Sequence, residues 1–184
     1  MIELFAAALL LQQDIVDCRS SSIVAQVLEC VARDPEVERY QAELANEGID
    51  CQAASNTRDM NTCVGLDLAR ETARMNLYLE AAGRRADEQD REQGFQPEDR
   101  TFGGAWLAAS QHAWQAYAGI ACEGVFDQWK GGSVRMVAVL GCWIDLTRDR
   151  THVIWRHHLT YPDSTPPILP EPVLPVRGEI ATAG

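Results

Sequence analysis

Hydrophobic residues recur every three or four positions along most of the chain, and this spacing predicts helices. The first helix is predicted to begin at Asp34-Pro35-Glu36 and to end at Gly48. Asp34 can accept hydrogen bonds from free backbone N–H groups, Pro35 suits a first helical turn, and Glu36 complements the helix dipole. The apolar stripe of this helix is Val37, Tyr40 and Leu44.

Three longer helices are predicted to follow. The next begins near Thr57 or Asp59 and runs to about Gly83, with Gln93 as the far alternative. Its apolar positions are Met60, Val64, Leu68, Met75 and Leu79. Another spans about Ala105 to Ala121, with an apolar face of Trp106, Ala109, Ala113, Ala116 or Tyr117, and Ile120. The last follows the Gly131-Gly132 turn and is predicted to be capped by Ser133. Its buried side is predicted to be Val134, Val137, Leu140 or Gly141, Ile144 and Trp155.

The C-terminal part differs, because six prolines fall between Pro162 and Pro175. Proline fixes φ and has no N–H, so residues 161–184 are predicted to form an extended, largely unpacked Pro-rich tail. No alternating pattern bounded by turns predicts a strand. The predicted fold class is therefore all-α: a small helical bundle with this tail.

The cysteines show an internal repeat. Cys18 and Cys30 are separated by 11 residues, and so are Cys51 and Cys63. In both pairs an Asp precedes the first Cys, a Val follows the second, and another Asp comes three residues later. At the same offset of 33 residues, further identities are Ser22 with Ser55, Glu38 with Glu71, Leu44 with Leu77, and Glu47 with Glu80. We interpret this as a tandem duplication of a module in which a Cys-closed loop leads into a helix.

Six cysteines allow 15 pairings, and the repeat favours one of them. Each module should close on itself, as Cys18–Cys30 and Cys51–Cys63, which leaves Cys122 to pair with Cys142. Each bridge would contribute on the order of 3 kcal/mol by restricting the unfolded chain. Structural zinc sites favour cysteines two to four residues apart, and no such pair occurs here.

The N-terminus and the disulfides together indicate export. Phe5 to Leu11 is an unbroken apolar run that resembles the core of a secretory signal, although Glu3 stands where a basic residue is usual. Residues 1–13 are therefore predicted to be a signal or hydrophobic segment, with the first turns of a buried helix as the alternative. Disulfides form in oxidising compartments, so a periplasmic or secreted location is expected. No apolar run reaches the roughly 20 residues of a membrane span, so no stable membrane insertion is expected after signal removal.

The chain of 184 residues carries 16 basic and 27 acidic side chains, a net charge of −11. Such acidity argues against binding to nucleic acids or anionic membranes. Residues 34–100 hold 16 acidic and 8 basic side chains, a net charge of −8. These charges are either solvated helix faces or a surface that attracts a basic protein.

Catalytic signatures are weak in this sequence. It contains no Gly-x-Ser-x-Gly, no phosphate-binding glycine loop and no His-Glu-x-x-His. The histidines, His112, His152, His157 and His158, lack the spacing of a helical metal pair. Asp87, Glu88 and Asp90 lie in a charged stretch with no sign of burial. We therefore predict a protein that is not an enzyme and has no catalytic residue, metal or cofactor.

Two stretches resemble the lysozyme inhibitor LprI-like family. The first is Asp17-Cys18, Cys30, Arg33 to Val37 and Glu43-Leu44. The second comprises Asp50-Cys51, Thr57, Met60-Asn61, Cys63, Gln111-x-x-Trp114-x-x-Tyr117, Cys122, Gly131-Gly132-Ser133, Cys142 and Leu146-Thr147-x-x-Arg150. The resemblance covers about residues 17–159. It marks Gln111, Trp114, Tyr117, Gly131, Gly132, Ser133 and Arg150 as family-motif residues.

The resemblance implies a small helical domain of exported bacterial proteins, whose named activity is inhibition of lysozyme. The domain organisation that we expect is a first Cys-loop-helix module at 14–48 and an LprI-like helical domain at 49–160. The expected function is inhibition of a lysozyme (muramidase) by binding this cationic enzyme in the bacterial envelope. The alternatives are a non-catalytic envelope structural or interaction protein of unknown partner, and an unrecognised envelope enzyme.

Overall fold

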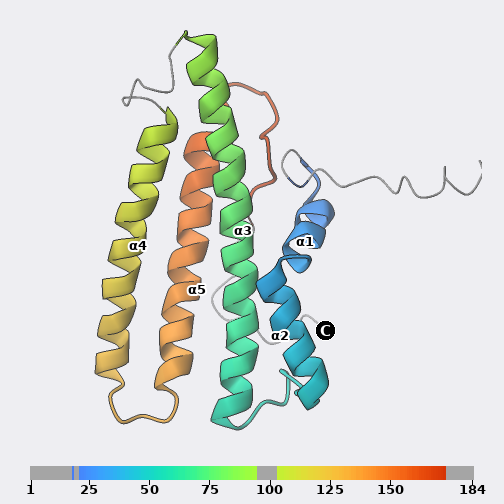
Figure 1. Ribbon diagram of the computed structural model, residues 1–184, viewed down its shortest axis with the longest axis vertical. Helices are drawn as coiled ribbons and strands as arrows, with labels where there is room; N and C mark the ends of the chain where they lie inside the picture. Colours follow the sequence, from blue (N-terminus) through green and yellow to red (C-terminus); the bar gives the residue numbers. More distant parts are fainter. Residues whose placement is uncertain (1–17, 19–20, 95–102, 173–184) are drawn as a thin grey trace, which may run out of the picture.

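The computed structural model describes residues 18, 21–94 and 103–172, and it is helical (Figure 1). The helices are α1 (Val24–Ala32), α2 (Pro35–Glu47), α3 (Thr57–Glu92), α4 (Gly103–Gln128) and α5 (Arg135–Ile154), followed by one π-helical stretch, η1 (Trp155–Leu159). These residue ranges contain no strand. The predicted all-α class is confirmed.

The longest helix, α3, lies at the centre of the arrangement. In Figure 1, α4 and α5 run along one side of α3, while α1 and α2 follow each other along its other side. All four of these helices contact α3, and across the described ranges no Cα atom of α1 or α2 comes within 8 Å of a Cα atom of α4 or α5. The backbones of the two helix pairs are therefore held apart by α3.

Two hydrophobic clusters fill the interfaces around α3, one along each half of that helix. The smaller cluster lies between α2, the end of α1 and the first half of α3; its buried members are Val31, Val37, Leu66, Ala69 and Ala73. The larger cluster joins the second half of α3 to α1, α4, α5 and the C-terminal segment; its buried members are Val27, Met75, Tyr78, Ala81, Ala82, Leu107, Ile154, Leu159 and Leu169. Burial of these apolar side chains is the main source of stability for both interfaces.

The predicted limits of α2 are confirmed by its local contacts. The Asp34 side chain accepts a hydrogen bond from the backbone N–H of Glu36 at 2.9 Å, and Gly48 ends the helix with a left-handed φ of 65°. Close packing against α3 depends on Gly65, because a Cβ there would lie 2.6 and 2.7 Å from two ring atoms of Tyr40 and 2.8 Å from its hydroxyl oxygen. The absence of that Cβ lets the Tyr40 ring rest directly on the α3 backbone.

The three predicted disulfides, Cys18–Cys30, Cys51–Cys63 and Cys122–Cys142, are all present. The loop closed by the first bridge contains most of α1, a helix that the sequence pattern did not predict. The third bridge joins α4 to α5 on either side of their connecting turn.

Several predicted details of the helices are wrong. Ser133 does not cap α5, because the N-cap is Val134 and no side chain caps the first turn. The nearer predicted end of the central helix, Gly83, is too early, since α3 continues to Glu92, and the predicted alternative, Gln93, is correct to within one residue. The helix placed at 105–121 extends over residues 103–128.

The predicted apolar face of α4 is also wrong. Trp106, Tyr117 and Ile120 are 67%, 60% and 73% exposed. The buried residues of α4 are Leu107, Gln111, Ala118 and Cys122. The helix is therefore rotated so that a different stripe, which includes an amide side chain, faces α3 and α5.

The prediction of a largely unpacked tail is wrong for residues 167–172, whereas residues 161–166 are exposed, and neither stretch is helical, as expected. Leu169 is completely buried in the larger cluster. The Tyr78 hydroxyl donates to the carbonyl oxygen of Pro170 at 2.6 Å, and the indole N–H of Trp155 donates to that of Leu169 at 3.0 Å. The remainder of the predicted tail, 173–184, and the predicted signal segment, 1–13, lie outside the described residues.

Candidate functional site

Two of the family-motif residues, Gln111 and Arg150, meet between α4 and α5. The Arg150 guanidinium donates from Nε to Gln111 Oε1 at 2.9 Å and from Nη2 to Ser110 Oγ at 2.8 Å. The Gln111 amide nitrogen lies 3.8 Å from the sulfur of Met75 on α3. Gln111 is only 7% exposed, and burial lowers the pKa of Arg150. These contacts join three helices, so this pair positions α4 rather than offering groups to a ligand.

The aromatic motif residues have different environments. Trp114 packs against the larger cluster and meets Trp143 of α5 edge to face, with ring centroids 6.4 Å apart at 76°. Tyr117, one turn further along α4, is 60% exposed. Trp114 is therefore part of the helix packing, whereas Tyr117 is available on the outer surface.

The glycine motif forms the tip of the α4–α5 hairpin, where the chain reverses direction (Figure 1). Gly131 has a φ of 88°, which a residue with a side chain rarely adopts. The N–H of Gly132 donates to the carbonyl of Trp129 at 2.9 Å, and a Cβ at Gly132 would lie 3.2 Å from that oxygen. Both glycines thus allow the tight turn, and Ser133 beside them is exposed.

A buried charged cluster that the sequence pattern does not predict connects α3 to α5. Glu71 is 6% exposed and forms ion pairs with Arg148 on α5 at 3.0 Å and with Arg74 on its own helix at 3.3 Å. Burial raises the pKa of the neighbouring Asp67 carboxyl, against the opposing charges of Arg70 and Arg148. Nothing in the local sequence separates Glu71 from exposed glutamates, because its partner is 77 residues away.

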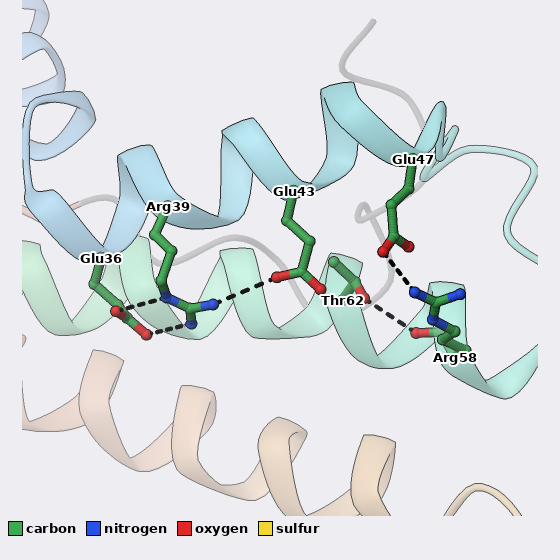
Figure 2. Close-up of polar contacts among 6 residues, drawn as sticks. All are labelled: Glu36, Arg39, Glu43, Glu47, Arg58 and Thr62. Atoms are coloured by element: carbon green, nitrogen blue, oxygen red, sulfur yellow. Dashed lines mark hydrogen bonds and ion pairs between the residues drawn. The ribbon is translucent and has the colours of Figure 1, made fainter.

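The outer face of α2 carries the exposed acidic side chains of this region (Figure 2). Arg39 bonds Glu36 through Nη2 at 2.6 Å and approaches Glu43 at 3.4 Å. Glu47 pairs with Arg58 at the start of α3. The bond from Arg39 lowers the pKa of the Glu36 carboxyl, so this group stays ionised at neutral pH. Four glutamates against one arginine leave α2 with a net charge of −3.

A shallow apolar pocket of about 280 Å³ lies between α1, α3 and the C-terminal segment. Its walls include Val24, Leu28 and Tyr78, with Arg74 and Glu171 as polar groups. His152 lies 3.2 Å from Glu171. Over the described ranges, no three His, Cys, Asp or Glu side chains are grouped as metal ligands would be. Over the same ranges, no helix is both long and apolar enough to span a membrane.

Comparison with known proteins places α3, α4 and nearly all of α5 within one family domain. The family model described as "Lysozyme inhibitor LprI" matches residues 50–153. An uncharacterized protein of Rhizobium meliloti (strain 1021) is 32% identical over 104 residues, which are 55% of this chain and 73% of that protein. No solved structure shows significant similarity to this chain.

Proposed function

The chain belongs to the lysozyme inhibitor LprI family, and on that basis we propose that it is an exported bacterial envelope protein that inhibits a lysozyme by binding to it. The family match over residues 50–153 carries this proposal. In this proposal the protein has no catalytic step of its own. It inhibits the lysozyme by binding to it.

The charge of the protein supports a cationic partner. The net charge is −11, and the outer face of α2 presents exposed carboxylates at neutral pH. A strongly acidic surface raises the rate of encounter with a basic protein. Added salt screens the charges and weakens this effect. Steering alone gives little affinity, so a buried contact must supplement it.

The disulfides support a periplasmic or secreted location. All six cysteines are paired, and none is free. Such bridges persist in oxidising compartments, which are also where a bacterial protein would meet a lysozyme.

The outer face of α4 favours a second candidate, a non-catalytic envelope interaction protein. This face exposes Tyr117 and Ile120, and the stretch from 103 to 122 has no Asp, Glu, Lys or Arg. An apolar helix face left in solvent is typical of an interaction surface. A neutral partner would use this face without salt dependence.

The test is lysozyme activity on bacterial cell walls with purified, oxidised protein at low and high salt. The proposal predicts dose-dependent inhibition that weakens as salt is raised. Neutralising two carboxylates of α2, the exposed Glu38 and the half-buried Glu43, with Glu38→Gln and Glu43→Gln should slow association, with the dissociation rate nearly unchanged. Absence of inhibition for animal and bacterial muramidases at micromolar protein would refute the proposal and leave the envelope interaction protein as the better hypothesis.

A further inference from the structure

We propose that the inhibitory contact is the tip of the α4–α5 hairpin, Trp129 to Ser133, and that it enters the carboxylate-lined cleft of the lysozyme. Lys130 would lie against the carboxylates of the cleft, and Trp129 would fill the adjacent sugar-binding surface. This inference rests on the proposed function, and it names the contact that the function leaves unspecified.

The tip has the shape needed to enter a cleft. It lies at the end of two long antiparallel helices and projects beyond their last turns (Figure 1). Trp129 is 46% exposed, and each residue from Lys130 to Ser133 is exposed. A convex tip of five residues is the complement of the concave site in which glycoside hydrolases bind their substrates.

The tip is also held in one conformation. Its backbone N–H groups donate within the turn, from Lys130 to the carbonyl of Asp127 at 3.2 Å and from Gly132 to that of Trp129 at 2.9 Å. The Cys122–Cys142 bridge ties the two helices together below the turn, with Cα atoms 5.6 Å apart. A segment that is rigid before binding loses little conformational entropy on binding.

The charge of the tip is opposite to that of the rest of the protein. Residues 128–144 contain no Asp or Glu, and they include Lys130, which is the single lysine of the chain, and Arg135. The carboxylate nearest in sequence is that of Asp127, which is exposed on the last turn of α4, before the tip begins. No ion pair within the described ranges involves Lys130, whereas Arg135 lies over the Phe126 ring at 4.7 Å. The dipoles of the α4 C-terminus and the α5 N-terminus meet here with opposite signs, so the two side chains make the tip positive.

The chemistry of the partner matches this tip. Retaining glycoside hydrolases, of which lysozyme is the type case, place two carboxyl groups on either side of the scissile bond, only about 5 to 5.5 Å apart. An ammonium group between them would form charge-assisted hydrogen bonds with both in a site that excludes water. An exposed indole beside it is the kind of aromatic group that provides most of the energy of a protein interface. The acidic body would attract the basic enzyme, and the basic tip would engage its acidic cleft.

These two electrostatic effects predict opposite results for one substitution. Lys130→Glu makes the protein two charges more acidic, which should strengthen long-range attraction to a basic lysozyme. The same substitution places a carboxylate among the cleft carboxylates, which should weaken inhibition about 10-fold or more. Arg156→Glu is the matched control, because Arg156 is exposed on η1 at the other end of α5 and the change in net charge is the same.

The experiment measures inhibition of a basic animal lysozyme by the wild type, Lys130→Glu, Lys130→Arg and Arg156→Glu, each checked for its helical circular dichroism. We expect the wild type, Lys130→Arg and Arg156→Glu to inhibit similarly, and Lys130→Glu to lose inhibition. If Lys130→Glu inhibits as well as Arg156→Glu, the tip proposal is wrong while the proposed function stands. If the wild type itself does not inhibit, the proposed function fails, and the tip proposal fails with it.

Competition with a trimer of N-acetylglucosamine, a fragment of the lysozyme substrate, gives an independent test. The trimer occupies the cleft, so saturating amounts should raise the apparent Kd of the wild-type protein for lysozyme in proportion to the trimer concentration. Binding that is unchanged by the trimer would place the contact outside the cleft and overturn the proposal.

Discussion

Replacing Leu169 with alanine should destabilise the protein as much as a substitution in the centre of a helix bundle. Leu169 lies in a proline-rich segment, between Pro167 and Pro170, where sequence alone predicts an exposed chain. In the structure its side chain is completely buried in the larger cluster with Tyr78 and Leu159. The free energy of unfolding lost on substitution therefore shows whether this segment is packed or solvated.

The expected magnitude follows from burial. Leu-to-Ala substitutions at fully buried sites cost about 2 to 5 kcal/mol, the sum of lost transfer free energy and the cavity left behind. The segment is fixed by hydrogen bonds from Tyr78 and Trp155 to its carbonyl groups, so its collapse into the cavity is restricted. We expect a loss of about 3 kcal/mol, which for a chain of this size lowers the Tm by about 6 to 12 °C.

Urea unfolding followed by circular dichroism measures this loss, with Leu28→Ala as the matched control. Leu28 is 49% exposed on α1, so its truncation should cost less than about 1 kcal/mol. If Leu169→Ala costs no more than Leu28→Ala, then residue 169 is not part of the core and the packing described above is wrong.

Tyr78 gives a second, local readout of the same contact. Burial raises its pKa to about 12. A pKa raised in the folded state stabilises the protein below the ordinary tyrosine pKa of about 10, and this contribution is lost as the pH rises from there toward 12. The absorbance change of tyrosine ionisation should therefore show one late-titrating group in the wild type, and Tyr78→Phe should remove it. If that late group persists in Tyr78→Phe, the assignment is wrong.

Three further outcomes are expected. Ala118→Ile should lower the free energy of unfolding by about 1 to 3 kcal/mol through overpacking, because Ala118 is completely buried. Ile120→Ala should change the free energy of unfolding by less than about 0.5 kcal/mol. If urea unfolding shows the reverse order, the buried face of α4 is the one predicted from the sequence. The double substitution Cys122→Ser with Cys142→Ser should cost about 3 kcal/mol, and a thermal melt unchanged by it would refute the stabilising role of that bridge. Burial lowers the pKa of His158, so its imidazole binds a proton less readily in the folded state than in the unfolded state. The free energy of unfolding should therefore fall as the pH drops below about 6.5. His158→Gln should reduce this pH dependence in unfolding measured from pH 7 to pH 5.

The features that sequence predicts correctly are those determined by neighbouring residues. The start and end of α2 follow from Asp34, Pro35 and Gly48, which act within one turn. The disulfide pairing follows from the repeated spacing of the cysteines. Each of these signals is complete within a few tens of residues.

The orientation of α4 could not be predicted in that way. Since the stretch 103–122 has no charged residue, the sequence does not distinguish a solvent face from a buried one. The observed buried face includes Gln111, which is tolerated because Arg150 of α5 donates to its amide oxygen. That partner is 39 residues away, and only the folded arrangement brings it to α4.

The C-terminal segment shows a related limit. Its prolines correctly predict a backbone that is not helical. Its packing depends instead on Leu169 between them and on carbonyl groups that accept from Tyr78 and Trp155. A proline-rich composition describes the backbone and leaves the burial of the intervening side chains undetermined.

The helices follow the interval of the repeat that the sequence suggests, and this correspondence relates α1 and α2 to α3. The N-caps of α1 and α3, Ile23 and Asn56, are 33 residues apart, which is the offset of the duplicated cysteines. Pro35 begins a new helix in the first copy, whereas the equivalent residue of the second copy, Leu68, continues α3. The pair α1 and α2 therefore corresponds to the first half of α3, broken at the proline.

The two copies differ in what covers them. Glu71 of the second copy is buried against Arg148 of α5, while the equivalent Glu38 of the first copy is exposed. The second copy thus became the centre of the bundle, with α4 and α5 on one side and the first copy on the other. The family match begins at residue 50, where the second copy begins. We therefore propose that the first copy is an outer addition to the LprI domain, whose exposed acidic face can change without disturbing the core of the bundle.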